Sequence, residues 1–174
     1  MNIGIWPYAE TDKGWTIPLE VMQGVWDRMV DLNRVKATFY DGGIQNEGDF
    51  IEYMQSPFIF PVLGVDSNRI CFKVIAWLKD VEDGKATGHF CYLDNYHPDP
   101  IMKILDYWSK LDSLRVIIGV TPEHYYATLK MIGRIGFKVI GKIPQFCNMH
   151  YENQFKAGVV SYYLLNEGED NGGK

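Results

Sequence analysis

Apolar residues near the start of the chain recur at intervals of three and four positions, which is the spacing of one face of a helix. Thr16 and Pro18 precede them, and a threonine cap followed by a proline in the first turn is a common helix start. We expect an amphipathic helix of about 15 residues here. Its apolar stripe comprises Val21, Met22, Val25, Trp26 and Met29. A second, shorter helix is expected through 50–54, opened by Asp49 and Glu52 in a capping-box pattern.

Strand-like segments occupy the middle of the chain. An apolar run covers 58–65, and residues 70–81 and 86–93 are rich in the apolar and aromatic residues of strands. The last two segments are separated by turn residues that include Asp83 and Gly84. We therefore expect two antiparallel hairpins in this region.

The helical spacing returns over 99–111. Asp99 is placed to cap this helix, and Pro100 would then occupy its first position. The segment 115–120 follows, and its apolar character throughout is typical of a central strand that is buried on both faces.

One further helix and two strands complete the predicted elements. Thr121 and Pro122 repeat the pattern of a cap followed by a proline, which predicts a helix start. Gly136 is placed where a helix end needs a left-handed residue. Strands are then expected over 137–147 and 157–165.

This order of elements predicts a mixed α/β fold, with a mostly antiparallel sheet of roughly six to seven strands and helices on both faces. The chain has 174 residues, of which 47% are hydrophobic, and this is enough for one core. We expect a single domain over 1–166, followed by a disordered polar tail over 167–174.

Composition narrows the range of functions. The net charge is −5 and no run of Lys or Arg occurs, which argues against nucleic-acid binding. No apolar run reaches the roughly 18 residues needed to cross a bilayer, and the first residues lack a signal-peptide profile. The three cysteines are widely spaced and form no metal-site pattern with the four histidines. We expect a cytoplasmic protein with reduced thiols and without a metal, nucleic-acid or membrane partner.

The element order resembles that of the GNAT superfamily of acetyl-CoA-dependent N-acetyltransferases. The resemblance covers roughly 15–165, mainly as topology. Its local signature is the helix end at Gly136 and Phe137, followed by a strand that carries Gly141. The chain is similar to a divergent member, and short divergent chains of this kind resemble proteins encoded in phages and prophages, so such an origin is an open alternative.

The resemblance implies a place for the cofactor. In this family acetyl-CoA lies in a V between two strands that splay apart, and these would be 86–93 and 115–120 here. The pantetheine arm would then contact Cys91, Tyr92 and Leu93, mainly through the backbone.

The loop that holds the cofactor's pyrophosphate in this family departs from the family pattern here. Members use spaced glycines and free N–H groups at a helix N-terminus. The matching segment, 94–100, has no glycine, and its two prolines lack the donor N–H. Asp94 and Asp99 also place negative charge where phosphate would bind. His97 and Lys103 are the residues that could compensate.

The usual catalytic acid of the family is also missing. Many members carry a tyrosine four residues before the glycine of the Gly-Phe pair, and Ile132 stands at that position. Tyr125 and Tyr126 are then the candidate proton donors to the leaving thiolate. His89 is a candidate base for the amine, although a lone histidine on a strand is commonly a hydrogen-bonded structural residue.

Three functions remain open on the sequence alone. The first is an N-acetyltransferase that moves an acetyl group from acetyl-CoA to an unidentified amine of a small molecule or a protein. The second is a cofactor-free GNAT-like domain that acts as an interaction or assembly protein of a phage or prophage. The third is a small-ligand binder without chemistry. The sequence leaves the oligomeric state open.

Overall fold

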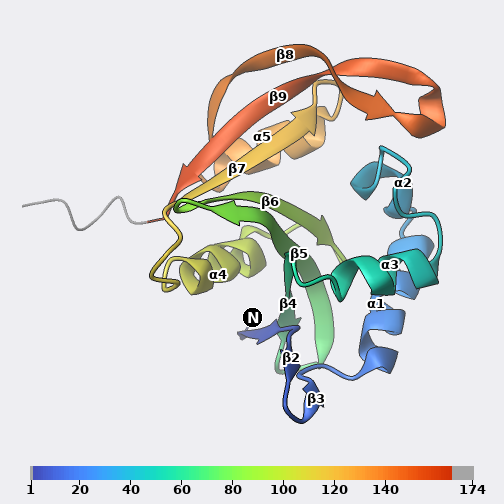
Figure 1. The fold of residues 1–174 in the computed structure, drawn as a ribbon, viewed down its shortest axis with the longest axis vertical. Coiled ribbons are helices and arrows are strands. Elements are labelled where there is room, and N and C mark those ends of the chain that lie inside the picture. Colours follow the sequence, from blue (N-terminus) through green and yellow to red (C-terminus); the bar gives the residue numbers. More distant parts are fainter. Residues whose placement is uncertain (1, 166–174) are drawn as a thin grey trace, which may run out of the picture.

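One parallel contact interrupts an otherwise antiparallel sheet in the computed structural model, which describes residues 2–165. Seven strands lie in the order β1-β4-β5-β6-β7-β9-β8, and only β6 and β7 run parallel (Figure 1). They are β1 (Ile3–Pro7), β4 (Ile59–Asp66), β5 (Cys71–Glu82), β6 (Lys85–Tyr92), β7 (Val116–Pro122), β8 (Lys138–Met149) and β9 (Gln154–Leu164), while β2 (Glu10–Thr11) and β3 (Gly14–Trp15) form a small separate hairpin. The predicted mostly antiparallel mixed sheet is confirmed, and the predicted tail over 167–174 lies outside the described residues.

Helices cover both faces of this sheet, as predicted (Figure 1). They are α1 (Leu19–Asp31), α2 (Val35–Thr38), α3 (Glu47–Met54), α4 (Pro98–Trp108) and α5 (Tyr126–Arg134), with a 3₁₀ turn at His150–Glu152. The helices α1 and α3 share a buried core with Trp77 and Cys91 of the sheet. The helix α4 packs on the opposite face against Val74 and Ala76, which point the other way along their strand.

The helix α1 begins at Leu19 after Pro18, so the prediction of Thr16 as its cap was wrong. The Thr16 hydroxyl instead donates to the carbonyl of Pro7 at 2.6 Å and accepts from the N–H of Ala9 at 3.0 Å. These two bonds tie the start of the helix to the end of β1, and they remove the hydroxyl from the helix terminus.

The helix α3 has a capping box one turn earlier than predicted. Asn46 is the cap, and its Oδ1 accepts from the N–H of Asp49 at 3.0 Å. Asp49 Oδ2 accepts in turn from the N–H of Gln45 at 3.0 Å. Asp49 is therefore the third residue of the helix and not its cap.

The helix α4 begins at Pro98, and the prediction of Asp99 as its cap was wrong. His97 is extended, and its ring Nδ1 accepts from the N–H of Asp99 at 3.3 Å. Because the imidazole takes the capping role, Asp99 becomes the second helical residue and Pro100 the third.

The helix α5 begins at Tyr126, four to five residues after the predicted start. Thr121 and Pro122 are still paired with β9, and the N–H of Glu123 donates to the carbonyl of Ala157 at 2.9 Å. The pairing of β7 with β9 therefore overrides the cap-like sequence.

The end of α5 follows the prediction. Gly136 has a φ of 101°, which is left-handed. The N–H of Phe137 donates to the carbonyl of Ile132 at 3.0 Å, and the N–H of Gly136 donates to that of Gly133 at 3.3 Å. These two bonds form a Schellman motif, which turns the chain from the helix into β8.

Candidate functional site

The strands β6 and β7 pair only at their beginnings. Lys85–Thr87 is paired with Val116–Ile118, and within the described part of the chain no later residues of the two strands are partners. The separation starts at Gly88, where a Cβ would lie 2.5 Å from Cγ2 of Ile117. Only a glycine fits there without displacing its neighbour. A cavity of about 460 Å³ lies in the opening beyond it.

Backbone groups of β6 face this cavity. The N–H of Leu93 donates to the carbonyl of Lys73 at 2.9 Å, and Nε of Arg28 donates to the Leu93 carbonyl at 3.0 Å, so both backbone groups of Leu93 have partners. Hydrogen bonding alternates along an antiparallel pair. The backbone groups of Phe90 and Tyr92 therefore point away from β5, toward the opening.

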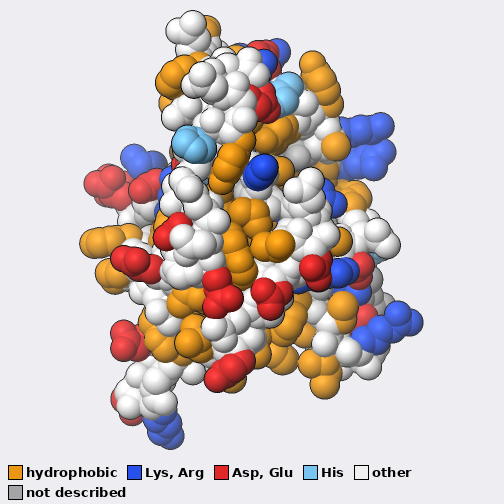
Figure 2. All heavy atoms as spheres, turned by 90° about the vertical axis from the view of Figure 1, so that its right-hand side faces the viewer, with side chains coloured by type: hydrophobic (Ala, Val, Ile, Leu, Met, Phe, Trp, Pro, Cys, Tyr) orange, Lys and Arg blue, Asp and Glu red, His pale blue; other side chains and the backbone are white. Residues whose placement is uncertain are grey.

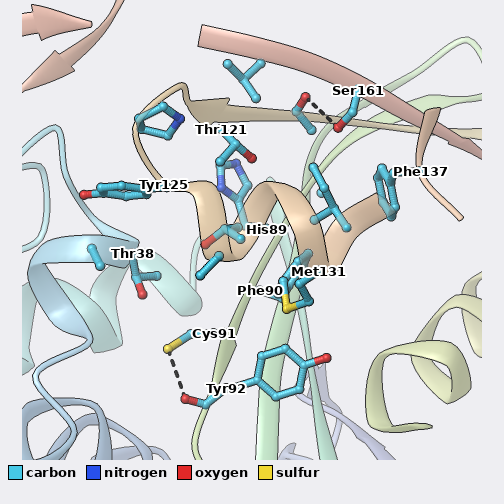
Figure 3. Close-up of a pocket in the computed structure, with 18 of the residues that line it drawn as sticks. Thr38, His89, Phe90, Cys91, Tyr92, Thr121, Tyr125, Met131, Phe137 and Ser161 are labelled. Carbon is cyan, nitrogen blue, oxygen red and sulfur yellow. Dashed lines mark hydrogen bonds between the residues drawn. The ribbon is translucent and has the colours of Figure 1, made fainter. Parts of the chain in front are cut away.

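The cavity reaches both faces of the sheet, because successive side chains of β6 point to opposite faces. His89 and Cys91 lie with Thr38 on the face that bears α1, α2 and α3, which we term the α2 side (Figure 3). Tyr92 lies with Met131 on the face that bears α4 and α5, which we term the α5 side. Figure 2 views the molecule from the α2 side and shows hydrophobic side chains at the middle of this face, with acidic side chains gathered below them.

His89 presents a buried nitrogen without a partner. Its Nε2 has no hydrogen-bond partner within residues 2–165. The ring is stacked on the indole of Trp77, with centroids 5.2 Å apart and planes at 6°. Burial lowers the pKa of His89 to about 4, and the charge of Lys79 adds to this effect. The imidazole is therefore neutral at pH 7.

Tyr92, which also lines the cavity, carries a second buried polar atom without a partner among residues 2–165. Its hydroxyl has no hydrogen-bond partner in the described part of the chain, and burial raises its pKa. Buried polar atoms are almost always paired in native proteins. Tyr92 Oη and His89 Nε2 are two exceptions among the described residues, and both belong to residues that line the cavity.

The two predicted proton donors have different surroundings. Tyr125 lines the cavity, and its ring lies edge-on to that of Tyr40, with centroids 6.4 Å apart. Burial raises the pKa of Tyr125, so its hydroxyl keeps its proton at neutral pH. Tyr126 is 75% exposed and does not line the cavity.

Cys91 lines the cavity as a neutral thiol. Its Sγ donates to the carbonyl of Tyr92 at 3.6 Å. Burial raises the pKa of Cys91 to about 11, against smaller opposing effects of Thr38 and Arg34. A thiol that keeps its proton contributes surface to the cavity and not a nucleophile.

The N-terminus of α4 offers few donors for an anion. The first and third helical residues, Pro98 and Pro100, have no N–H. The N–H of Asp99 is already donated to His97. A helix start usually leaves four N–H groups without a partner in the helix, here those of residues 97–100. Two of these residues are prolines and the N–H of Asp99 is bonded, so only the N–H of His97 remains.

The charges around this corner are arranged differently from the prediction. Lys73 Nζ lies 2.5 Å from Asp94 Oδ2, and this bond lowers the pKa of Asp94 and offsets its charge. Neither His97 nor Lys103 lines the cavity, whereas Tyr96 of the same segment does. The segment therefore contributes an aromatic ring to the site and no cation.

Three cations that the sequence analysis did not select line the cavity instead. They are Arg34, just before α2, and Lys130 and Arg134, one turn apart on α5. None of them forms an ion pair within residues 2–165, and no described residue of the lining is Asp or Glu. The spacing of Lys130 and Arg134 beside the apolar stripe of α5 was a signal in the sequence, whereas Arg34 had none.

Two absences among the described residues bear on function. No group of three or more His, Cys, Asp or Glu side chains among residues 2–165 is placed to hold a metal ion. No helix in this part of the chain is long and apolar enough to cross a membrane.

No protein-family model and no curated protein matches this chain. Solved structures do match it. A spermidine N-acetyltransferase from Vibrio cholerae, in complex with CoA and spermine, has a TM-score of 0.70 at 10% identity over 94% of this chain and 95% of that one. A ribosomal-protein-S5-alanine acetyltransferase from Vibrio fischeri has a TM-score of 0.67 at 10% identity, over 87% and 91% of the two chains. An N-acetyltransferase from Staphylococcus aureus Mu50 has a TM-score of 0.68 at 9% identity, over 95% and 99%. Across most of its length, this chain has the GNAT-like fold of these N-acetyltransferases.

Proposed function

We propose that this protein is an N-acetyltransferase that moves the acetyl group of acetyl-CoA to an amine. One observation carries the proposal: the cavity in the opening between β6 and β7 combines backbone groups, unpartnered buried polar atoms and cations without any acid in its described lining. An elongated, anionic ligand with amide groups in its middle fits such a lining.

The backbone of β6 is suited to the pantetheine arm. Phe90 and Tyr92 each turn an N–H and a carbonyl toward the opening. The amides of an extended arm can pair with such groups in the manner of an added strand. We assign this contact to Phe90 and Tyr92, with Cys91 packing beside them, although the Tyr92 carbonyl also accepts from Cys91 Sγ. Leu93 is not assigned, because both its N–H and its carbonyl already have partners.

The phosphates of the cofactor need cations, and the α5 side of the cavity supplies them. Lys130 and Arg134 flank Met131 along α5, so they lie on the same face of the sheet as Tyr92 and Tyr96. They are exposed at the rim and have no acidic partner among the described residues. We assign phosphate binding to these two residues, because the N-terminus of α4 has too few free donors.

The cavity also holds groups that suit acetyl transfer. When bound, acetyl-CoA supplies an acetyl group on a thioester sulfur, which leaves as a thiolate and takes up a proton. The Tyr125 hydroxyl is the candidate donor, because it lines the cavity and its raised pKa keeps it protonated. The neutral His89 can accept a hydrogen bond from the attacking amine at Nε2 and orient it. With a pKa near 4 it is a weak base, so we give it a positioning role.

Calorimetry with acetyl-CoA tests the proposal. We expect the unmodified chain to bind acetyl-CoA in the micromolar range. The Lys130→Gln/Arg134→Gln double variant should lose affinity about tenfold or more, since each substitution removes a charge-assisted contact. Lys103→Gln is the matched control, because it removes an exposed cation that lies outside the cavity lining. No binding at millimolar acetyl-CoA would refute the proposal. An effect of Lys103→Gln alone would refute the assignment of the phosphates.

The apolar surface of the β8–β9 hairpin favours a second candidate, a cofactor-free interaction or assembly protein. Val139, Ile140, Phe146 and Phe155 of this hairpin are 53% to 65% exposed. Exposed apolar surface of this kind is typical of a protein contact. Failure of acetyl-CoA to bind would favour this second function. A phage or prophage origin stays a prediction from the sequence.

A further inference from the structure

We infer that the amine acceptor also carries an acidic group, a carboxylate or a phosphate, which pairs with Arg34 on the α2 side of the cavity. The inference rests on the proposed function and adds the class of acceptor. It excludes polyamines as the preferred substrates.

The position of Arg34 is fixed by the end of α1. Asn33 is left-handed, with a φ of 52°, and its N–H donates to the carbonyl of Val30 at 2.9 Å. The N–H of Arg34 donates to the carbonyl of Met29 at 2.8 Å. Together these bonds form a Schellman motif, which holds the backbone of Arg34 at the cavity rim. The carbonyl of Arg34 then begins α2 by accepting from Thr38 at 2.9 Å.

The guanidinium of Arg34 has no acid to neutralise it within the cavity. No described lining residue is Asp or Glu, and Arg34 forms no ion pair within residues 2–165. Asp41 is nearby in the chain, but it lies outside the lining and its Oδ1 accepts from the N–H of Gly43 at 3.2 Å. The charge of Arg34 acts on the buried thiol of Cys91, because it opposes the rise in the pKa of Cys91 that burial causes.

Arg34 and the two other cations line the cavity from opposite faces of the sheet. Arg34 precedes α2, on the face of Cys91 and Thr38, whereas Lys130 and Arg134 lie on α5, on the face of Tyr92. If the phosphates of the cofactor occupy the α5 side, they leave Arg34 unmatched. The anion that pairs with Arg34 must then belong to the other substrate.

The length of the acceptor follows from the spacing of β6. His89 and Cys91 are two residues apart on one face, which is about 7 Å along a strand. We take this spacing as the distance between an amine held at His89 and an anion held by Arg34, and it corresponds to a chain of roughly five or six carbons. A diamine or polyamine would instead bring a second positive charge toward Arg34.

Three amines of one chain length test this inference: 6-aminohexanoate, hexylamine and 1,6-diaminohexane. They differ only at the end remote from the amine, which is anionic, neutral or cationic. Acetyl transfer is followed by the release of the CoA thiol. We expect kcat/KM for 6-aminohexanoate to exceed that for hexylamine about tenfold or more, as for a charge-assisted contact, and the diamine to be the poorest acceptor.

Two variants assign the preference to its residue. Arg34→Gln should raise KM for 6-aminohexanoate about tenfold, leave hexylamine unchanged and leave acetyl-CoA affinity unchanged. Lys36→Gln is the control, because Lys36 is an exposed cation of α2 that lies over the Tyr151 ring at 5.4 Å and outside the lining. A preference for the diamine, equal use of the three amines, or a loss of acetyl-CoA affinity in Arg34→Gln would overturn this inference alone. Failure of the unmodified chain to bind acetyl-CoA would overturn the proposed function, and this inference with it.

Discussion

The imidazole of His89 lies parallel to the indole of Trp77, at 5.2 Å between ring centroids, and its Nε2 faces no partner among the described residues. This stacking holds the imidazole in place where it lines the α2 side of the cavity. Burial disfavours the charged form of this stacked imidazole, so it stays neutral where a free histidine would begin to charge.

The first prediction concerns the pH dependence of stability. The pKa of His89 is lowered to about 4, so between pH 6.5 and 4 the unfolded chain binds a proton that the folded chain excludes. The free energy of unfolding should therefore fall as the pH is lowered through this window, by roughly 3 kcal/mol from this group. His89→Phe keeps an aromatic ring on Trp77 and removes the titration. Urea unfolding of both proteins at pH 7 and pH 4.5 measures the difference, and equal losses in the two would contradict the account.

The second prediction concerns the point at which β6 and β7 separate. Gly88→Ala places a methyl 2.5 Å from Cγ2 of Ile117, so we expect a loss of about 1–3 kcal/mol in the free energy of unfolding. Ile117→Leu removes that Cγ2 methyl and should recover part of the loss in the double variant. Ile117→Leu alone is the control. A Gly88→Ala protein as stable as the unmodified chain would show that the strands can separate further.

The third prediction concerns the proton donor. Tyr125→Phe should lower kcat about 100-fold with little change in acetyl-CoA affinity, because it removes only the hydroxyl. Tyr126→Phe removes the same group from a residue that is 75% exposed and outside the lining, and it should leave kcat unchanged. Similar effects of the two variants would argue against Tyr125 as the acid.

The fourth prediction concerns the corner between β6 and α4. Lys73→Met leaves the carboxylate of Asp94 without its partner at 2.5 Å. The freed negative charge should weaken acetyl-CoA binding severalfold, by repelling the phosphates. The double variant Lys73→Met/Asp94→Asn removes both charges and should restore the affinity. If it fails to do so, Lys73 acts on the cofactor directly.

Local sequence signals predicted much of the fold. The strand-like segments gave β4, β5 and β6, and the Gly136-Phe137 pair gave the end of α5, because these features depend on nearby residues alone. The helix starts were less predictable. Thr121 and Pro122 resemble a cap and a first turn, but they remain in β7 because the distant strand β9 pairs with them.

The candidate site was predicted in part. The strand that lines it was identified, and His89, Cys91, Tyr92 and Tyr125 do meet in one cavity. The cations were missed because only the tertiary fold brings them together. Arg34 and Arg134 are far apart in the chain and line the same cavity from opposite faces of the sheet. No local sequence pattern around Arg34 indicates that it lines a cavity.

The most direct test of the central claim is an amide NMR titration of the uniformly ¹⁵N-labelled chain with acetyl-CoA. We expect the largest shifts on the amides of Phe90, Tyr92 and Met131, which line the cavity, while those of Gly48 and Glu52, in the groove between α1 and α3, stay unchanged. Shifts confined to that groove, or none at millimolar acetyl-CoA, would contradict the central claim.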